Sequence, residues 1–76
     1  MITIRQLEYL LALKEKRHFG RAAAQCHVTQ PTLSMQIKLL EEQLGAVLIE
    51  RKKGDLFFTP YGEEVITHAQ AILNHA

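Results

Sequence analysis

The chain has little of what builds a disulfide framework or a membrane span. It contains one cysteine and no tryptophan. A single cysteine cannot form an internal disulfide, which fits a reducing compartment. No run of about 18 apolar residues is present, and the first residues lack the basic, apolar and small-residue order of a signal peptide. We therefore expect a cytoplasmic protein that has no membrane partner.

Side chains that perform catalysis or bind metals are also few. The four histidines, His18, His27, His68 and His75, show no zinc-ligand spacing with Cys26. No nucleophile is spaced with a base in a recognisable pattern, and no acid-base pair is evident. We expect no metal, no cofactor, no catalytic residue and no enzymatic activity. Cys26 itself is predicted to be a small, buried apolar residue.

The sequence does contain enough apolar residues for one small folded domain. The 76 residues are 47% apolar and carry a formal net charge of +1. A domain of this size buries only about 60% of the surface that its unfolded chain exposes, so a partner subunit would add stability. Lysine and arginine occur only in residues 1–59, whereas residues 60–76 carry Glu63 and Glu64. This polarity fits one face for a polyanion and another turned away from it.

Residues 18–45 predict two helices joined by a tight turn. The first helix, roughly residues 19–25, carries three consecutive alanines, whose small side chains allow helices to cross closely. The second helix should begin at Gln30, because Thr29 is a good N-cap and a proline follows in the first turn. It should end at Gly45, which can supply the left-handed residue of a helix end. A short helix, a turn and a longer helix form a helix-turn-helix.

The longer helix has a core face and an exposed face. Its core face carries apolar residues at helical spacing, which are Leu33, Ile37, Leu40 and Leu44. The exposed beginning of the helix carries small hydrogen-bonding side chains and no acid. Glutamine can pair with adenine, and hydroxyls and helix N–H groups can bond bases or phosphates. With their N-cap, the residues expected to contact DNA here are Thr29, Gln30, Pro31, Thr32, Ser34, Met35 and Lys38.

Two residues on this surface, Met35 and Arg21, have two interpretations each, and Lys38 has one. Met35 either makes apolar contact with a thymine methyl group or is a tolerated surface methionine. Lys38 is predicted to bind a phosphate, since a single lysine on a helix flank detects charge and not sequence. Arg21, on the short helix, is either a phosphate contact or an ordinary surface charge.

The segments on either side are predicted to support the helix-turn-helix. Thr3 and Gln6 form a capping box for a first helix, whose apolar residues fall on two sides and should be buried on both. Residues 47–49 and 56–59 predict two short strands joined by a tight turn. A lone hairpin is unstable, so it must pack on the helices. It would form a wing, with basic residues near its tip that can touch phosphates: Arg51, Lys52 and Lys53.

A last helix is predicted to begin at Thr59-Pro60, where a cap and a first-turn proline occur together. An apolar stripe follows, consisting of Tyr61, Val65, Ala69, Ile72 and Ala76, with Leu73 beside it. No glycine or proline ends the stripe, so we expect the chain to be either a truncated piece or one module of a longer protein. The residues expected to form a dimer contact are Tyr9, Leu13, Val65, Ala69, Ile72 and Leu73.

Taken together, these segments resemble the LysR-type bacterial transcriptional regulators. That family shows F-x-R-A-A, then V-S/T-Q-P-x-L-S-x-Q-I, L-E-x-x-L-G, E-R and L-T-x-x-G. The chain reads HFGRAAAQCHVTQPTLSMQIKLLEEQLG and then LIERKKGDLFFTPYGE. Its HF and CHVTQPTLS segments look most like the peroxide-sensing OxyR branch. The chain departs from the family at Met35, where a basic residue is frequent, and at Cys26, where leucine is frequent.

The resemblance implies a mainly α fold, a winged helix-turn-helix of three helices, a two-stranded β-hairpin wing and a C-terminal linker helix. Residues 1–59 would form the DNA-binding domain, with the helix-turn-helix motif at residues 18–37. Residues 60–76 would begin the linker helix, which in the family pairs in a dimer and leads to an effector-binding domain absent from this chain. In the OxyR branch the reactive cysteines belong to that domain, so no redox role is expected for Cys26.

The functional implication is sequence-specific binding of double-stranded promoter or operator DNA by a homodimer, which forms a tetramer in the full-length protein. Two alternatives stay open at this point. One is a winged helix-turn-helix repressor of another family. The other is a helical protein-protein assembly module that uses Tyr9, Leu13 and the last-helix stripe without binding DNA.

Overall fold

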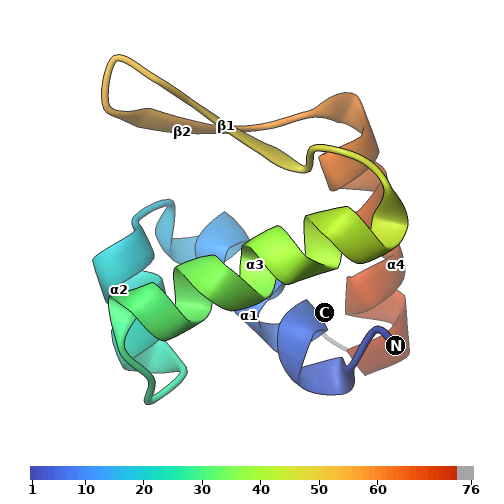
Figure 1. Ribbon diagram of the computed structural model, residues 1–76, viewed down its shortest axis with the longest axis horizontal. Coiled ribbons are helices and arrows are strands. Elements are labelled where there is room, and N and C mark those ends of the chain that lie inside the picture. The colour runs from blue at the N-terminus through green and yellow to red at the C-terminus, as the bar shows by residue number, and fades with distance from the viewer. Residues whose placement is uncertain (74–76) are drawn as a thin grey trace.

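The computed structural model describes residues 1–73 and confirms a mainly α winged helix-turn-helix (Figure 1). The second and third helices, Phe19–Gln25 and Gln30–Leu44, lie against each other, and the hairpin stands above them. The last helix, Pro60–Leu73, lies on the other side of the first helix, Ile4–Lys16 (Figure 1). The predicted stripe residue Ala76 lies outside the described residues. The elements in chain order are α1 (Ile4–Lys16), α2 (Phe19–Gln25), α3 (Gln30–Leu44), β1 (Ile49–Lys52), β2 (Asp55–Phe58) and α4 (Pro60–Leu73).

The predicted caps fix the helix ends. Thr3 and Gln6 form the capping box of α1, with bonds of 3.1 and 2.9 Å between each side chain and the other residue's backbone N–H. The Thr29 hydroxyl accepts the Thr32 N–H at the start of α3, and Gly45 ends that helix at a φ of 68°. Histidine is an unusual cap, yet His18 Nδ1 accepts the Arg21 N–H at 3.0 Å and starts α2.

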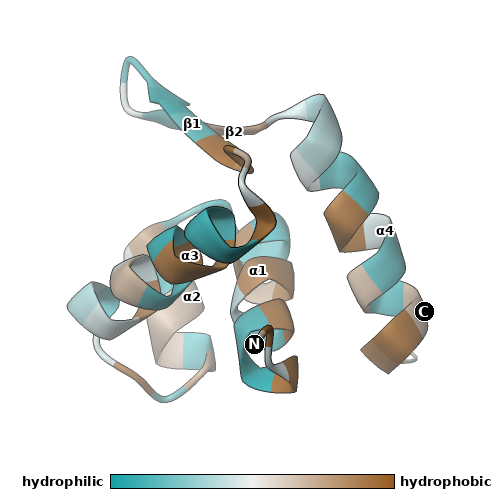
Figure 2. Ribbon diagram, turned by 45° about the vertical axis from the view of Figure 1, so that its right-hand side comes forward, coloured by the Kyte–Doolittle hydropathy of each residue, from teal (hydrophilic) through white to brown (hydrophobic). Residues whose placement is uncertain are grey.

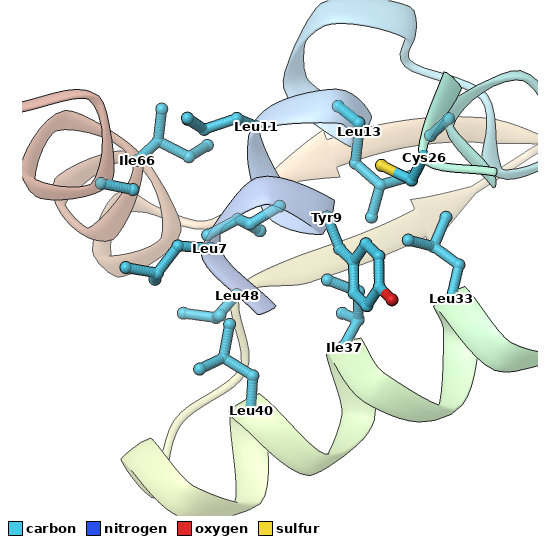
Figure 3. Packing of buried hydrophobic residues seen from close by; sticks show 14 of the residues in the cluster. Leu7, Tyr9, Leu11, Leu13, Cys26, Leu33, Ile37, Leu40, Leu48 and Ile66 are labelled. Carbon is cyan, nitrogen blue, oxygen red and sulfur yellow. The ribbon is translucent and has the colours of Figure 1, made fainter. Parts of the chain in front are cut away.

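Helix α1 is buried along two sides, as predicted. It packs against α2 and α3 on one side and against α4 on the other. Figure 3 shows Tyr9 beside Leu33 and Ile37 of α3, while Leu11 faces Ile66 of α4. This arrangement makes α1 the centre of the hydrophobic core.

Three residues predicted to form the dimer contact are instead in this core, and that part of the prediction is wrong. Tyr9, Leu13 and Ala69 are each at most 5% exposed within the single chain. Tyr9 and Leu13 lie on the second apolar side of α1, which meets the neighbouring helices of the same chain. They therefore have no surface to offer a partner.

The apolar residues of α4 lie in two rows around the helix, whereas the sequence predicted a single stripe. One row packs on α1 and consists of Gly62, Ile66, Ala69 and half-buried Leu73. The other row faces outward and consists of Tyr61, half-buried Val65, His68 and Ile72. Both rows have spacings of four, three and four, but they lie about 100° apart around the helix.

The hairpin has the predicted pairing and a two-residue turn. Ile49 pairs with Phe58, and Lys52 pairs with Asp55 at the turn. Lys53 and Gly54 both have positive φ, 53° and 82°, as a type I′ turn requires. The strand begins at Ile49, not at residue 47. Leu48 and Leu56 are buried and Phe58 is half-buried against the core, so these three residues pack the hairpin on the helices, as the sequence predicted for the hairpin as a whole.

Polar contacts hold the hairpin to α3 and to the end of α1. Glu41 Oε2 accepts the backbone N–H groups of Leu48 at 2.8 Å and of Ile49 at 3.3 Å. On the other strand, Arg17 Nη2 donates to the Leu56 carbonyl at 2.9 Å. The hairpin is thus fixed to the helices at both strands.

The junction between β2 and α4 is a close backbone contact. The Thr59 hydroxyl donates to the Val47 carbonyl at 2.7 Å and accepts the Gly62 N–H at 2.9 Å. Gly62 lies directly against the backbone of Leu48, and a Cβ at this position would collide with the Leu48 carbonyl oxygen. Glycine is required here for close approach, not for an unusual φ.

Replacing Gly62 with alanine should destabilise the chain. Alanine gains about 1 kcal/mol in helix propensity, but the forced shift of α4 from Leu48 should cost about 1–3 kcal/mol and exceed or cancel that gain. Urea unfolding followed by circular dichroism measures the free energy of unfolding. The control is Gln70→Ala, on the exposed side of the same helix. A Gly62→Ala chain more stable than the wild type would contradict this packing.

Replacing Glu41 with alanine should also destabilise the chain, because the half-buried N–H groups at the start of β1 lose their acceptor. The expected loss is about 1–3 kcal/mol in the free energy of unfolding. The neighbouring Glu42 is exposed, so Glu42→Ala should change stability by less than about 0.5 kcal/mol. Equal effects of the two substitutions would argue against the anchoring role of Glu41.

Candidate nucleic-acid interface

The N-terminal half of α3 is uncovered by the rest of the chain. Gln30, Pro31, Met35 and Lys38 are exposed, and Thr32 and Ser34 are half-buried. Figure 1 shows this half of α3 beside α2 and below the hairpin. The side of α3 with Leu33, Ile37 and Leu40 is buried. The surface predicted to face DNA is therefore accessible from solvent.

Thr29 and Thr32 are bonded to each other. The Thr29 hydroxyl accepts the Thr32 N–H at 3.3 Å and lies 2.9 Å from the Thr32 hydroxyl, to which it donates. This places Thr29 at the helix start as a cap that orients its neighbour. Both hydroxyls retain acceptor capacity toward solvent.

The basic side chains divide into two groups. Arg5, Lys14 and Lys16 lie within 3.4, 2.9 and 3.7 Å of carboxylates on Glu8, Glu63 and Glu15, and Arg17 bonds the hairpin backbone. The other five make no ion pair among residues 1–73. They are Arg21 on α2, Lys38 on α3, Arg51 and Lys52 on β1, and Lys53 in the turn.

Two of these five cations, Lys38 and Arg51, lie on facing elements at one groove, and Lys52 and Lys53 follow Arg51 along the hairpin. The outer half of the hairpin is polar in Figure 2, and it stands over the exposed part of α3. A groove lies between α3 and β1, and its walls include Ser34, Lys38 and Arg51. Positive charge that lies beside a groove and is not paired with a carboxylate raises the local concentration of a polyanion.

Arg51 also has a contact that the sequence analysis did not foresee. Its guanidinium lies 4.0 Å from the centre of the Phe19 ring, which places a cation over an aromatic face. The side chain thereby bridges β1 and α2, and it lines the groove at the same time. Lys52 and Lys53, farther along the hairpin, are exposed.

Cys26 and the histidines form no chemical centre in the described part of the chain. Cys26 is buried, its burial raises the pKa of the thiol, and its carbonyl oxygen accepts Arg5 Nη2 at 2.8 Å. Within residues 1–73, no three His, Cys, Asp or Glu side chains gather as a metal site would require. In the same residues, no helix is long and apolar enough to cross a membrane.

Known proteins share this sequence and this geometry. Residues 4–63 match the family described as bacterial regulatory helix-turn-helix protein, lysR family. The DNA-binding transcriptional dual regulator OxyR of Escherichia coli K12 is 51% identical over 95% of the chain. The hydrogen peroxide-inducible genes activator of Haemophilus influenzae is 49% identical over the same share. The chain spans about a quarter of the length of these curated relatives, 24% in both cases.

Solved structures agree closely with the fold. Full-length OxyR C199D from Pseudomonas aeruginosa superposes with a TM-score of 0.92 at 44% identity, covering 97% of this chain and 25% of that one. The BenM DNA-binding domain in complex with catB site 1 DNA superposes with a TM-score of 0.91 at 37% identity, covering 96% of this chain and 78% of that one. The family match, residues 4–63, includes α1, α2, α3, the hairpin and the first turn of α4, and the chain therefore belongs to the lysR family of bacterial regulatory helix-turn-helix proteins.

Proposed function

We propose that this chain is the DNA-binding domain of a LysR-type transcriptional regulator, in which α3 contacts base edges in the major groove. The observation that carries the proposal is the uncovered start of α3, together with a groove beside this helix whose walls include Lys38 and Arg51, neither of which forms an ion pair among residues 1–73. The BenM domain, which has the same fold, was solved with DNA. The family match removes the alternative of a repressor from another family.

The exposed side chains suit distinct parts of the duplex. The major groove is about 12 Å wide and admits one α-helix. From the start of α3, the Gln30 amide can bond adenine at two atoms, and Thr32 and Ser34 can bond bases or phosphates. Lys38, Arg21 and the basic hairpin residues supply phosphate contacts, which give affinity without sequence preference.

A dimer formed by α4 would place two α3 helices on one face of the duplex, about 34–36 Å apart. The outward row of α4 supports this proposal, because Tyr61 and Ile72 are large and exposed and Val65 is half-buried. Of the residues first expected in the dimer contact, Val65 and Ile72 lie on the outward row of α4, whereas Leu73 is half-buried in the row that packs on α1. We further propose a tetramer for the full-length regulator and a location in the bacterial cytoplasm, where its DNA lies.

The identity to OxyR supports a peroxide-responsive regulator. On this proposal residues 1–59 bind DNA, residues 60–76 begin the linker helix, and peroxide sensing belongs to a region outside the quarter of OxyR that the chain spans. Cys26 takes no part in it, and the chain has no enzymatic role. The assembly-module alternative is weakened because Tyr9 and Leu13, which it requires on the surface, are buried.

Two substitutions on α3 should separate sequence reading from charge. Gln30→Ala should cost about 1–3 kcal/mol on a preferred site and flatten the preference among sequences. Lys38→Ala should weaken all sequences alike and lower the salt slope, the fall of log K with log salt, by about 0.9. Fluorescence anisotropy over a salt series measures both quantities.

The control for charge is Lys16→Ala, at the far end of α1, which should leave the salt slope nearly unchanged. If Gln30→Ala and Lys38→Ala changed the salt slope and nothing else, α3 would not be reading bases. Absence of any salt-dependent DNA binding by the wild type would leave the assembly module as the better proposal.

A charge on the outward row of α4 should weaken the dimer. Ile72 is 61% exposed, and Ile72→Asp would place a carboxylate in an apolar contact, where burial of an unpaired charge is costly. Sedimentation equilibrium should show a dissociation constant raised at least about tenfold, equivalent to about 1.4 kcal/mol. Gln70→Asp adds the same charge off the row and should have little effect. Similar association of both variants would place the dimer contact elsewhere.

A further inference from the structure

Met35 is an apolar side chain in a position that the core does not explain. It is 62% exposed, although it lies in the middle of a helix whose other large apolar residues include the fully buried Leu33 and Leu40. Met35 is two positions after Leu33, which places it about 200° around the helix axis, on the side opposite the core. Pro31 lies on that same side, one turn earlier, and is also exposed.

The direction of the side chain brings it toward the proposed recognition residues. Side chains of an α-helix lean toward its N-terminus, so Met35 leans toward the turn that carries Pro31 and Thr32. Methionine is unbranched and adapts its shape to an irregular surface. An exposed Met35 side chain contributes no favourable hydrophobic free energy, whereas burial against an apolar group would remove its surface from water and be favourable.

The chemistry of the side chain limits what it can recognise. A thioether has no hydrogen-bond donor, so Met35 cannot bond a phosphate or the O6 and N7 acceptors of guanine. The floor of the major groove presents one apolar group, the C5-methyl of thymine. A methionine on the groove-facing side of α3 therefore matches one base and offers nothing favourable to guanine.

We propose that Met35 is a specificity-determining residue that selects thymine by packing on its C5-methyl group. This inference rests on the proposed function, since it requires α3 to lie in the major groove. Gln30, at the exposed start of the same helix, suits adenine. Together the two side chains select a step rich in A·T pairs within each half-site.

The test uses the chain and a duplex enriched by it from a random-sequence library. Each thymine of that duplex is replaced in turn by deoxyuridine, which removes the methyl group and leaves the pairing edge intact. For the wild type, one or two thymines should show a roughly fourfold loss of affinity, the effect of one buried methyl group. For Met35→Ala, the same replacements should have no effect on affinity.

Leu39→Ala is the matched control. Leu39 is also an exposed apolar residue of α3, at 40%, but it lies one turn farther from the helix start. This variant should keep the wild-type pattern of sensitivity to deoxyuridine. The inference is overturned if Met35→Ala keeps that pattern, or if the wild type prefers the selected duplex yet tolerates deoxyuridine at every position. If no sequence is enriched, the proposed function fails as well.

Discussion

The burial of α1 along both of its sides is the constraint on which the rest of the structure depends. Helices α2 and α3 cover one side and α4 covers the other, so that a chain of 76 residues has one continuous core. Because α3 gives only its Leu33, Ile37 and Leu40 side to that core, its opposite side stays in solvent. The exposure of the proposed DNA-reading surface is therefore a direct result of how little of α3 the core requires.

The hairpin is held by polar contacts as well as by apolar burial. Leu48 and Leu56 are buried, Glu41 bonds the backbone at the start of β1, and Arg17, at the end of α1, bonds the backbone of β2. The stack of Arg51 on Phe19 adds a third point of contact, with α2. These interactions keep the basic hairpin next to α3. The charged side chains of Glu41, Arg17 and Arg51 therefore have a structural role in addition to their charge.

Local features of the fold could be predicted from the sequence, because helix caps, core stripes and the two-residue turn depend on neighbouring residues. Thr29, Gly45 and Thr59 mark their helix ends as expected. The expected dimer contact of Tyr9 and Leu13 was wrong. Periodicity indicates that these residues are buried, but it does not indicate whether the same chain or a partner subunit covers them. The roles of Glu41, Arg51 and Gly62 also escaped prediction. Each depends on a contact with a distant segment, and only the three-dimensional structure brings those segments together.

The junction at Thr59 has a mechanical consequence. A single residue separates β2 from α4, and its hydroxyl is bonded on both sides, to Val47 and to Gly62. The Gly62 backbone also lies against Leu48. A change in the orientation of α4 at its first turn would therefore have to break these contacts or carry the base of the hairpin with it.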